Sequence, residues 1–442
     1  LATTTAEELR EQVTFLKQEL EKARDENKAQ MKTESQLQEE LGSGGSDTPQ
    51  PDSAQSISES VYGYRQRAPI EPFVFQPTPR KALVDAIAAD VRATYPPDEM
   101  ERRMFALVTI GFVFDPEFDS GKPTFNMDES LVGLRTNQEG FYYDPPTRTL
   151  KYPNDAPLGN PGERGKFIEG VVRALARDLP DAEENLVVVP SNADRTVARR
   201  SLEIGDATQV KIRYNLMEQF SGGVAPPPSP ESQQQFYGAP IYLRELALFP
   251  YFHGSRFVEI LQKDGGWERV DSAYGRVPTS SAEILHPELY LADPPFVPVE
   301  VSLPDGPVLD VGQVWSDTAG ELGLRLFFTM ARSEPKVGEK AAEGWTGDRY
   351  AVFKNGAYVW ELTWADPNEA SEFFMEMREA LLRRYQIPFD KVFVQAGAFV
   401  AEAEGRVIRM RYLGDDKTRI QVVVAEDKGF ADALEAKLEE RR

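Results

Sequence analysis

The segment YAVFKNGAYVWELTWADPNEASEFFMEMREALLRRYQ, residues 350–386, decides the fold class of this chain. Residues 350–353 and 357–363 are rich in β-branched and aromatic side chains and are separated by turn residues, which predicts two neighbouring strands. Residues 366–385 repeat apolar side chains at helical spacing, which predicts a helix. We therefore expect an antiparallel sheet with this helix packed on it.

The same alternation of strand-like and helical segments continues to the end of the chain. Further short runs of strand character, bounded by turn residues, occupy residues 391–394, 406–412 and 419–424, and a last helix is expected at 429–441. Together with the segment above, these elements predict a C-terminal α+β domain that spans residues 296–442.

The region before this domain, residues 72–295, has a different pattern. Apolar side chains recur there mainly at spacings of three and four, which favours helices. We expect these helices at residues 81–95, 98–111, 163–178, 194–218 and 240–263. The fold class predicted for the whole body is therefore α+β, with a mainly helical domain first.

The first 41 residues carry a heptad pattern. A seam at 4-3-4 spacing, with one polar residue of the kind that fixes a parallel two-stranded register, is formed by Leu9, Val13, Leu16, Leu20 and Asn27. The pattern predicts a coiled coil that pairs two copies of the chain, and a lone solvated helix is the alternative. Residues 42–71, rich in Gly, Ser, Asp, Pro and Gln, are expected to form a flexible linker.

Composition restricts the classes of function. The chain has 72 acidic and 50 basic residues, a formal net charge of −22 and no cysteine. The negative charge repels phosphate backbones, so we expect no nucleic-acid partner. Without cysteine, disulfides, thiolate metal ligands and cysteine nucleophiles are excluded.

The beginning of the chain bears on its location. The sequence starts at Leu1 instead of Met, and no stretch approaches the roughly 18 apolar residues that a membrane helix needs. The missing start indicates a signal sequence, a membrane anchor or trimmed residues upstream of Leu1. We expect an exported protein that works in the periplasm or at the cell surface.

Several ordered segments resemble one known family. They read GFYYDPPTRTL at 140–150, IGDAT at 204–208, LALFPYFHGSRFV at 246–258 and GWTGDRY at 344–350. These segments resemble the bacterial zincin-like metallopeptidases whose metal helix carries His-Glu-Leu-Thr-His-Ala-Leu-Gln-Asp. The resemblance covers about residues 75–365 and implies a zincin-like fold for residues 72–295.

The resemblance also implies where a metal site would lie. Such a site needs two histidines one helical turn apart, a glutamate as general base and a third ligand from another helix. The alignment places Glu169 and Arg173 at the two histidine positions, Gly170 at the general-base position and Ile204 at the third ligand. We therefore expect no metal, no other cofactor and no catalytic residue.

The replaced residues still predict a cleft. Glu169 and Arg173 stand four residues apart and can neutralise each other, either in a partly wet cleft or as a solvated pair on a surface helix. The residues expected to line that cleft are Glu169, Arg173, Asp206, Tyr142 and His286.

These observations lead to a functional expectation. The chain is expected to be a catalytically inactive metallopeptidase-like protein that binds a protein or peptide, or serves as a scaffold, in the bacterial cell envelope, and that forms a homodimer through its coiled coil. Two alternatives are a divergent hydrolase that uses acidic residues around the former metal site, and a purely structural envelope protein.

Overall fold

A computed structural model describes residues 53–113, 125–155, 158–217, 230–332, 335–395, 397–403 and 405–440. These residues belong to one compact unit, Asp52–Arg442. The coiled coil expected over residues 1–41 lies outside the described residues.

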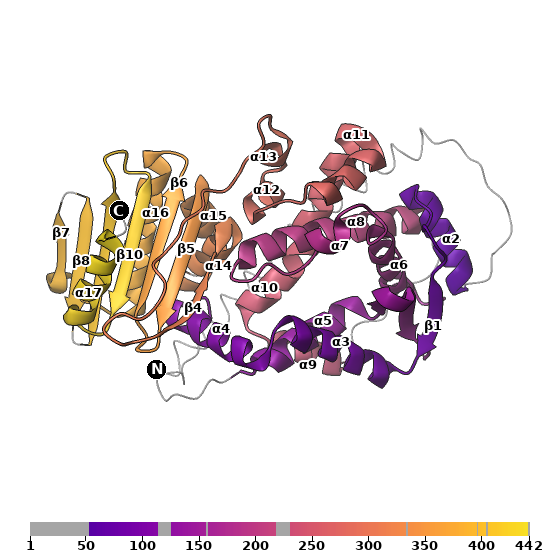
Figure 1. Cartoon of the computed structure of the whole chain (residues 1–442), viewed down its shortest axis with the longest axis horizontal. Coiled ribbons are helices and arrows are strands. Elements are labelled where there is room, and N and C mark those ends of the chain that lie inside the picture. The colour runs from indigo at the N-terminus through magenta and orange to yellow at the C-terminus, as the bar shows by residue number, and fades with distance from the viewer. Residues whose placement is uncertain are drawn as a thin grey trace. The chain divides into compact units, whose positions relative to one another are not determined.

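The C-terminal part contains a seven-stranded sheet in which every described neighbouring pair is antiparallel (Figure 1). Its strand order is β4-β5-β6-β10-β9-β8-β7. The strands are β4 (Gln313–Asp317), β5 (Trp345–Phe353), β6 (Tyr358–Trp364), β7 (Val392–Gln395), β8 (Ala398–Ala403), β9 (Arg406–Leu413) and β10 (Arg419–Ala425). The α+β class with an antiparallel C-terminal sheet is therefore confirmed.

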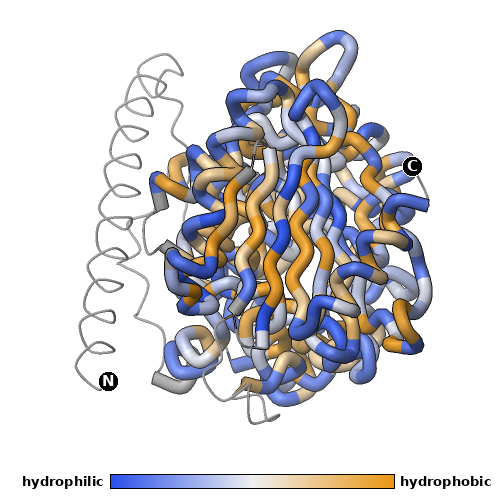
Figure 2. The backbone as a smooth tube through the Cα atoms, turned by 90° about the vertical axis from the view of Figure 1, so that its left-hand side faces the viewer, coloured by the Kyte–Doolittle hydropathy of each residue, from blue (hydrophilic) through white to orange (hydrophobic). Residues whose placement is uncertain are grey.

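Helices cover both faces of this sheet. Successive side chains of a strand point to opposite faces, so neighbouring residues of β10 enter different cores. Val422 packs with residues of α14 (Gly320–Arg332) and α16 (Pro367–Arg384), whereas Val423 packs with residues of α17 (Lys428–Glu439). Since both faces are buried, the central strands are apolar along most of their length, as Figure 2 shows.

The helical part precedes the sheet and contains a small sheet of its own, with strand order β1-β3-β2. Its strands are β1 (Val74–Thr78), β2 (Tyr142–Asp144) and β3 (Thr149–Pro153). Its longer helices are α2 (Ala54–Arg65), α3 (Arg80–Thr94), α4 (Pro97–Ile110), α5 (Met127–Glu139), α6 (Pro161–Ala176), α8 (Ala193–Met217), α10 (Ile241–Phe249) and α11 (Ser255–Gly275). Shorter helices are α7 (Ala182–Asn185), α9 (Pro230–Gly238), α12 (Ser281–Leu285), α13 (Pro287–Leu291) and α15 (Pro335–Ala342).

Each predicted helix has a counterpart in the structure, but α5 and α14 are not predicted from the sequence, and two further segments differ from expectation. The helix expected at 240–263 continues through a π-helical turn, Pro250–Gly254, and on to Gly275, with non-helical backbone at Gly265 and Gly266. The expected linker 42–71 is wrong over its second half, because Ala54–Arg65 form α2. Ile57 and Val61 of α2 are buried in the core of the helical part. Apolar residues four apart, in an otherwise polar segment, are enough to dock the helix.

The two expected domains, 72–295 and 296–442, share a core. Phe112, which follows α4 and is fully buried, lies 5.6 Å from Trp360 of β6 between ring centres. In addition, Arg384 of α16 donates hydrogen bonds to the carbonyl oxygens of Val108 and Ile110 at the end of α4. The boundary near residue 295 therefore separates two architectures within one compact unit.

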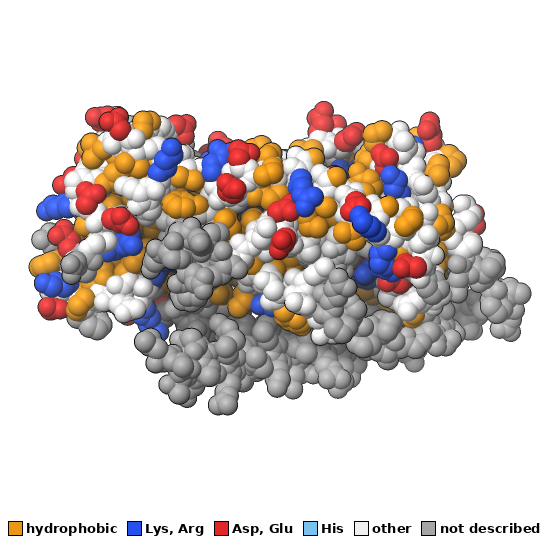
Figure 3. All heavy atoms as spheres, turned by 90° about the horizontal axis from the view of Figure 1, so that it is seen from below, with side chains coloured by type: hydrophobic (Ala, Val, Ile, Leu, Met, Phe, Trp, Pro, Cys, Tyr) orange, Lys and Arg blue, Asp and Glu red, His pale blue; other side chains and the backbone are white. Residues whose placement is uncertain are grey.

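The described surface has mixed charge. Lys and Arg side chains alternate with Asp and Glu over the face seen in Figure 3. None of the described helices combines the length and the apolar character that crossing a bilayer requires.

Candidate functional site

The expected metal position lies where α5, α6 and α8 meet. Glu169 of α6 is buried, and its carboxylate pairs with the ammonium group of Lys211 on α8. Arg173, one turn further along α6, places its Nη1 atom 2.9 Å from Oε1 of Glu139 at the end of α5. The expected pairing of Glu169 with Arg173 is therefore wrong, because partners from other helices take both side chains.

These contacts extend into a network that we call the ion-pair network: Glu139, Arg135, Arg173, Glu203 and Arg177. Arg135 Nε lies 2.8 Å from Glu139 Oε2, Arg173 Nε lies 3.5 Å from Glu203 Oε1, and Arg177 Nη2 lies 3.0 Å from the same Glu203 oxygen. Glu139 and Glu203 are both buried. The cleft expected around Arg173 is closed at this point by opposite charges from three helices.

The network controls the ionisation of Glu139. Burial alone raises the pKa of this carboxyl group, but the positive charges of Arg135, Arg173 and Arg200 outweigh burial and lower the pKa to about 2. Glu139 is therefore charged throughout the physiological pH range and holds the arginines by charge.

Gly170 and Ile204 occupy the remaining expected positions. A Cβ atom at Gly170 would stand 2.8 Å from Cγ of Phe141 and 3.1 Å from Cδ1 of Leu150, so a larger side chain has no room there. Ile204 is 2% exposed. Zinc does not fit this set of residues, because its donors would be a carboxylate already paired with lysine, a guanidinium group and an aliphatic side chain.

Asp206 lies in a separate buried cluster. Its Oδ1 atom is 2.8 Å from Nε of Arg65 on α2, and its Oδ2 atom accepts a hydrogen bond of 2.9 Å from the hydroxyl of Tyr274 on α11. Arg65 also contacts Asp271 at 2.6 Å and lies 4.5 Å from the ring centre of Trp267. Asp206 is therefore a fastening point between α2, α8 and α11, and it does not line an open cleft.

Of the last two expected cleft residues, His286 lies apart from both clusters. Tyr142 lies beside the ion-pair network, where burial raises the pKa of its hydroxyl and the charge of Arg135 opposes this shift. His286 stands between α12 and α13, with its Nε2 atom 2.9 Å from Oε1 of the buried Glu321 on α14. Tyr142 is on β2, with the ammonium of Lys151 5.5 Å from its ring centre. The five side chains expected to share one cleft therefore fall into separate groups.

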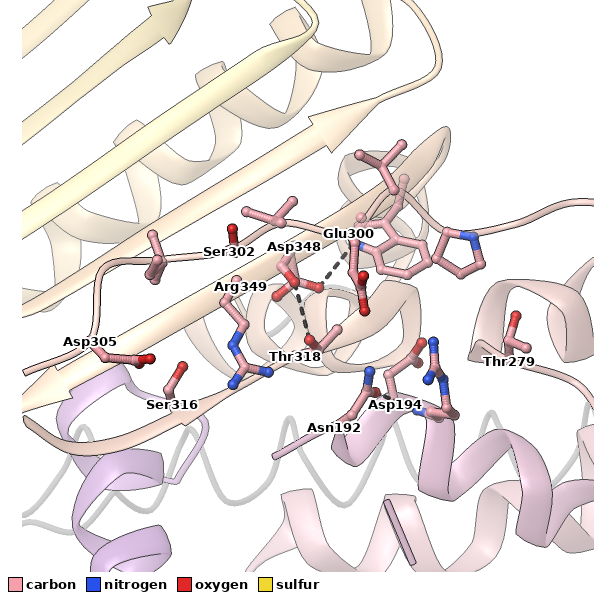
Figure 4. Close-up of a pocket in the computed structure, with 17 residues that line it drawn as sticks. Asn192, Asp194, Thr279, Glu300, Ser302, Asp305, Ser316, Thr318, Asp348 and Arg349 are labelled. Carbon is pink, nitrogen blue, oxygen red and sulfur yellow. Dashed lines mark hydrogen bonds between the residues drawn. The ribbon is translucent and has the colours of Figure 1, made fainter. Parts of the chain in front are cut away.

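A pocket of about 450 Å³ lies instead at the junction between the helical part and the sheet (Figure 4). Its walls come from the start of α8, from β4 and β5, and from the extended segment 298–303. The polar side chains that line it include Asn192, Asp194, Arg195, Thr318, Asp348 and Arg349.

Segment 298–303 forms the outer wall of this pocket, and Gly347 allows it to pack closely against β5. The backbone N–H of Val299 donates a hydrogen bond of 2.7 Å to the carbonyl oxygen of Thr346. A Cβ atom at Gly347 would overlap the carbonyl oxygen of Val299, so only glycine lets segment 298–303 lie this close to β5.

Asp348 organises the floor of the pocket. It accepts hydrogen bonds from the backbone N–H groups of Ala319 and Gly320, at 3.0 and 2.9 Å, at the start of α14. The indole N–H groups of Trp345 and Trp360 donate to the same carboxylate, at 3.1 and 2.9 Å. Asp348 thereby ties the first turn of α14 to β5 and β6.

Asp194 has a different environment. Its Oδ1 atom accepts a hydrogen bond of 3.0 Å from the backbone N–H of Ser281, and its side chain is 3% exposed. Burial raises the pKa of Asp194 to about 8, the hydrogen bonds from Ser281 oppose this shift, and the charges of Asp348 and Glu321 add to it. At neutral pH Asp194 is therefore mostly protonated and uncharged.

The residues of this pocket are not predicted as a site by the sequence. The segment 344–350 is singled out by resemblance, and Trp345, Gly347, Asp348 and Arg349 of that segment line the pocket. The other polar groups come from residues 192–195, 279, 300–305 and 316–318, which nothing in the sequence pattern connects.

Comparisons with known proteins identify one part of the chain. Residues 308–440 match a family described as a domain of unknown function (DUF8575). The match covers the region of the seven-stranded sheet and its helices. No curated protein and no solved structure matches the chain.

Proposed function

We propose that this chain is a catalytically inactive binding or scaffolding protein with a metallopeptidase-like helical part. One observation carries the proposal: the positions that would hold zinc and the general base are filled by buried ion pairs and by the packing of Phe141 on Gly170. Arginine cannot act as a zinc ligand while protonated, and Glu169 is already neutralised by Lys211.

Zinc binding and stability measured together test this proposal. The full chain is incubated with zinc, freed of excess metal and analysed by mass spectrometry, and its thermal unfolding is followed with and without a chelator. We expect no stoichiometric zinc and no change in melting temperature, because a structural or catalytic zinc site stabilises the folded state. Stoichiometric zinc that the chelator removes, with a fall in melting temperature, would contradict the proposal.

The alternative of a divergent hydrolase makes a different prediction. In that case, activity on peptide or glycan libraries would disappear in Glu169→Gln or Asp206→Asn while the variants stayed folded. Both carboxylates are held by cations, so we expect any background hydrolysis to be unaffected by either change.

We further propose that the heptad seam of residues 1–41 pairs two chains, and that the protein acts in the periplasm or at the cell surface. Light scattering on the full chain and on a version that begins at Asp52, where the compact unit starts, tests the pairing. The shorter version is expected to shift toward monomer, and equal masses at equal concentration would contradict self-association. Fusion of the full gene product to a compartment-sensitive reporter tests the location.

A further inference from the structure

Two arginine side chains line the junction pocket. Arg195 comes from the first turn of α8, and Arg349 comes from β5. Figure 4 shows Arg349 reaching toward the start of α8, where Asn192 and Asp194 lie. Both side chains are partly buried, so solvent screens their charges only in part.

Neither arginine has a carboxylate partner within the described part of the chain. Arg349 donates a hydrogen bond to the carbonyl oxygen of Ser191, which leaves its charge uncompensated. The Nε atom of Arg195 is buried and has no hydrogen-bond partner among the described residues. Arg65, by contrast, is buried and pairs with both Asp206 and Asp271.

The rest of the lining is suited to a ligand that carries hydroxyl groups. Asn192, Thr279 and Thr318 line the same space, and each already uses part of its hydrogen-bonding capacity. Asn192 Oδ1 accepts from the backbone N–H of Arg195, and the hydroxyl groups of Thr279 and Thr318 donate to Glu283 and to the carbonyl oxygen of Asp348. The amide N–H groups of Asn192 remain as donors and the two hydroxyl oxygens as acceptors, and sugar hydroxyls can pair with both. A volume of about 450 Å³ lies within the range of small-molecule pockets.

The acidic groups of the pocket do not oppose an anion at neutral pH. Asp194 is mostly protonated there, and Asp348 is occupied by four N–H donors. Glu300 and Asp305 are exposed, so solvent and salt screen their charges. Glu321, the other acid that acts on Asp194, is paired with Arg325.

We infer that the junction pocket binds a small, hydroxyl-rich anion whose carboxylate or phosphate group is held by the guanidinium groups of Arg195 and Arg349. Guanidinium groups form strong, directional hydrogen bonds with both kinds of anion. The inference names the ligand class for the proposed binding role, but it does not depend on the loss of metal chemistry in the helical part.

Calorimetric titration of the full chain with three probes tests this inference. Glucuronate supplies a carboxylate, glucose 6-phosphate supplies a phosphate, and glucose has hydroxyl groups without charge. We expect one or both anions to bind more tightly than glucose. In Arg195→Met and in Arg349→Met, the affinity for the anion should fall by about tenfold, because each variant loses charge-assisted hydrogen bonds.

Arg244→Met is the matched control. Arg244 lies on α10 and is partly buried like the two pocket arginines. Its guanidinium carbon is 5.5 Å from the ring centre of Tyr237, and it does not line the pocket. This variant should bind like the wild type. If a Met variant fails to fold, Arg195→Lys and Arg349→Lys keep the charge but lose the forked geometry, and a smaller fall in affinity is expected.

A pH series with glucuronate adds a second readout, because its carboxylate does not titrate near neutral pH. Its affinity should fall as the pH rises through about 8 in the wild type, and should stay constant in Asp194→Asn. Three results would overturn the inference: no binding of either anion at millimolar concentration, equal binding of glucose, or equal affinity in the Arg195, Arg349 and Arg244 variants. Each differs from the zinc result that would overturn the proposed function.

Discussion

Glu139 in the ion-pair network and Asp194 in the junction pocket are carboxylic acids with the same exposure, 3%, in two regions of one molecule. The pKa of Glu139 is lowered to about 2, whereas the pKa of Asp194 is raised to about 8. Burial raises both values. Three arginines around Glu139 reverse the effect of burial, while Asp194 has the hydrogen bonds of Ser281 and two acids nearby.

This difference shows that the charges near a buried acid, and not its burial alone, set its protonation state. It also gives the two regions opposite dependences on pH. Glu139 stabilises the folded state fully above its unfolded pKa, about 4.5, and this contribution is lost as the pH falls toward 2. Asp194, with its raised pKa, makes the folded state progressively less stable as the pH rises from about 3.8 to about 8.

The largest expected effect comes from breaking the ion-pair network. Arg173→Met leaves Glu139 and Glu203 without one of their cations, in a place where water cannot replace it. We expect a loss of about 3–5 kcal/mol in the free energy of unfolding, measured by urea denaturation near neutral pH.

Arg80→Met serves as the control, because Arg80 pairs with Asp155 at the surface, where the two side chains are 47% and 56% exposed. A loss below about 1 kcal/mol is expected there. If Arg173→Met lowered the free energy of unfolding no more than Arg80→Met does, the ion-pair network would contribute little to stability. The different environments of Glu139 and Asp194 would then not produce different contributions to stability.

A smaller effect, with a distinctive pH dependence, is expected from Asp194→Asn. Asparagine keeps the oxygen that accepts from Ser281 and resembles the protonated acid. The variant should therefore gain stability over the wild type as the pH rises toward 8, by at most about 1.4 kcal/mol per pH unit. Urea unfolding at a series of pH values measures the slope.

Asp98→Asn, at a side chain that is 78% exposed, should follow the wild type across the same series. A difference between Asp194→Asn and the wild type that did not change with pH would mean that Asp194 is ionised in the folded protein. The junction pocket would then hold an ionised buried carboxylate, as the ion-pair network does.

The sequence predicts local structure well and long-range partners poorly. The strands at 350–353 and 419–424 and the helix at 366–385 follow from periodicity and lie where expected. Glu169 and Arg173 have the spacing of a helical pair, but each has a distant partner. Lys211 follows Glu169 by 42 residues, and Glu139 precedes Arg173 by 34 residues.

The same limit explains the misread linker and the missed pocket. The polar composition around α2 predicts a flexible linker. The structure instead anchors α2 to the helical part, because Arg65 pairs with Asp206, 141 residues away. In the pocket, Arg195 and Arg349 come from separate elements that only the shared core brings together. No local pattern records such pairings.

The smallest expected effect concerns His286. Its environment is intermediate between those of Glu139 and Asp194, because it is only partly buried and has one close carboxylate partner. Its hydrogen bond to Glu321 raises the pKa of His286 above 6.5, and its side chain is 32% exposed. The folded state therefore gains stability below pH 6.5, and this gain is lost as the pH rises through the raised pKa. Glu321 also has Arg325 as a partner and Glu288 lies 3.7 Å from Nδ1, so the histidine is one of several charges.

We expect His286→Phe to lower the free energy of unfolding by less than about 1 kcal/mol at acidic pH, and by less still at alkaline pH. The chain has two histidines, so a proton NMR titration of the wild type and of His253→Asn assigns and measures the imidazole of His286 directly. A His286 pKa at or below 6.5 would contradict the pairing with Glu321. It would also mean that Glu321, which already pairs with Arg325, does not stabilise a second positive charge on His286. Glu139, by contrast, pairs with more than one arginine.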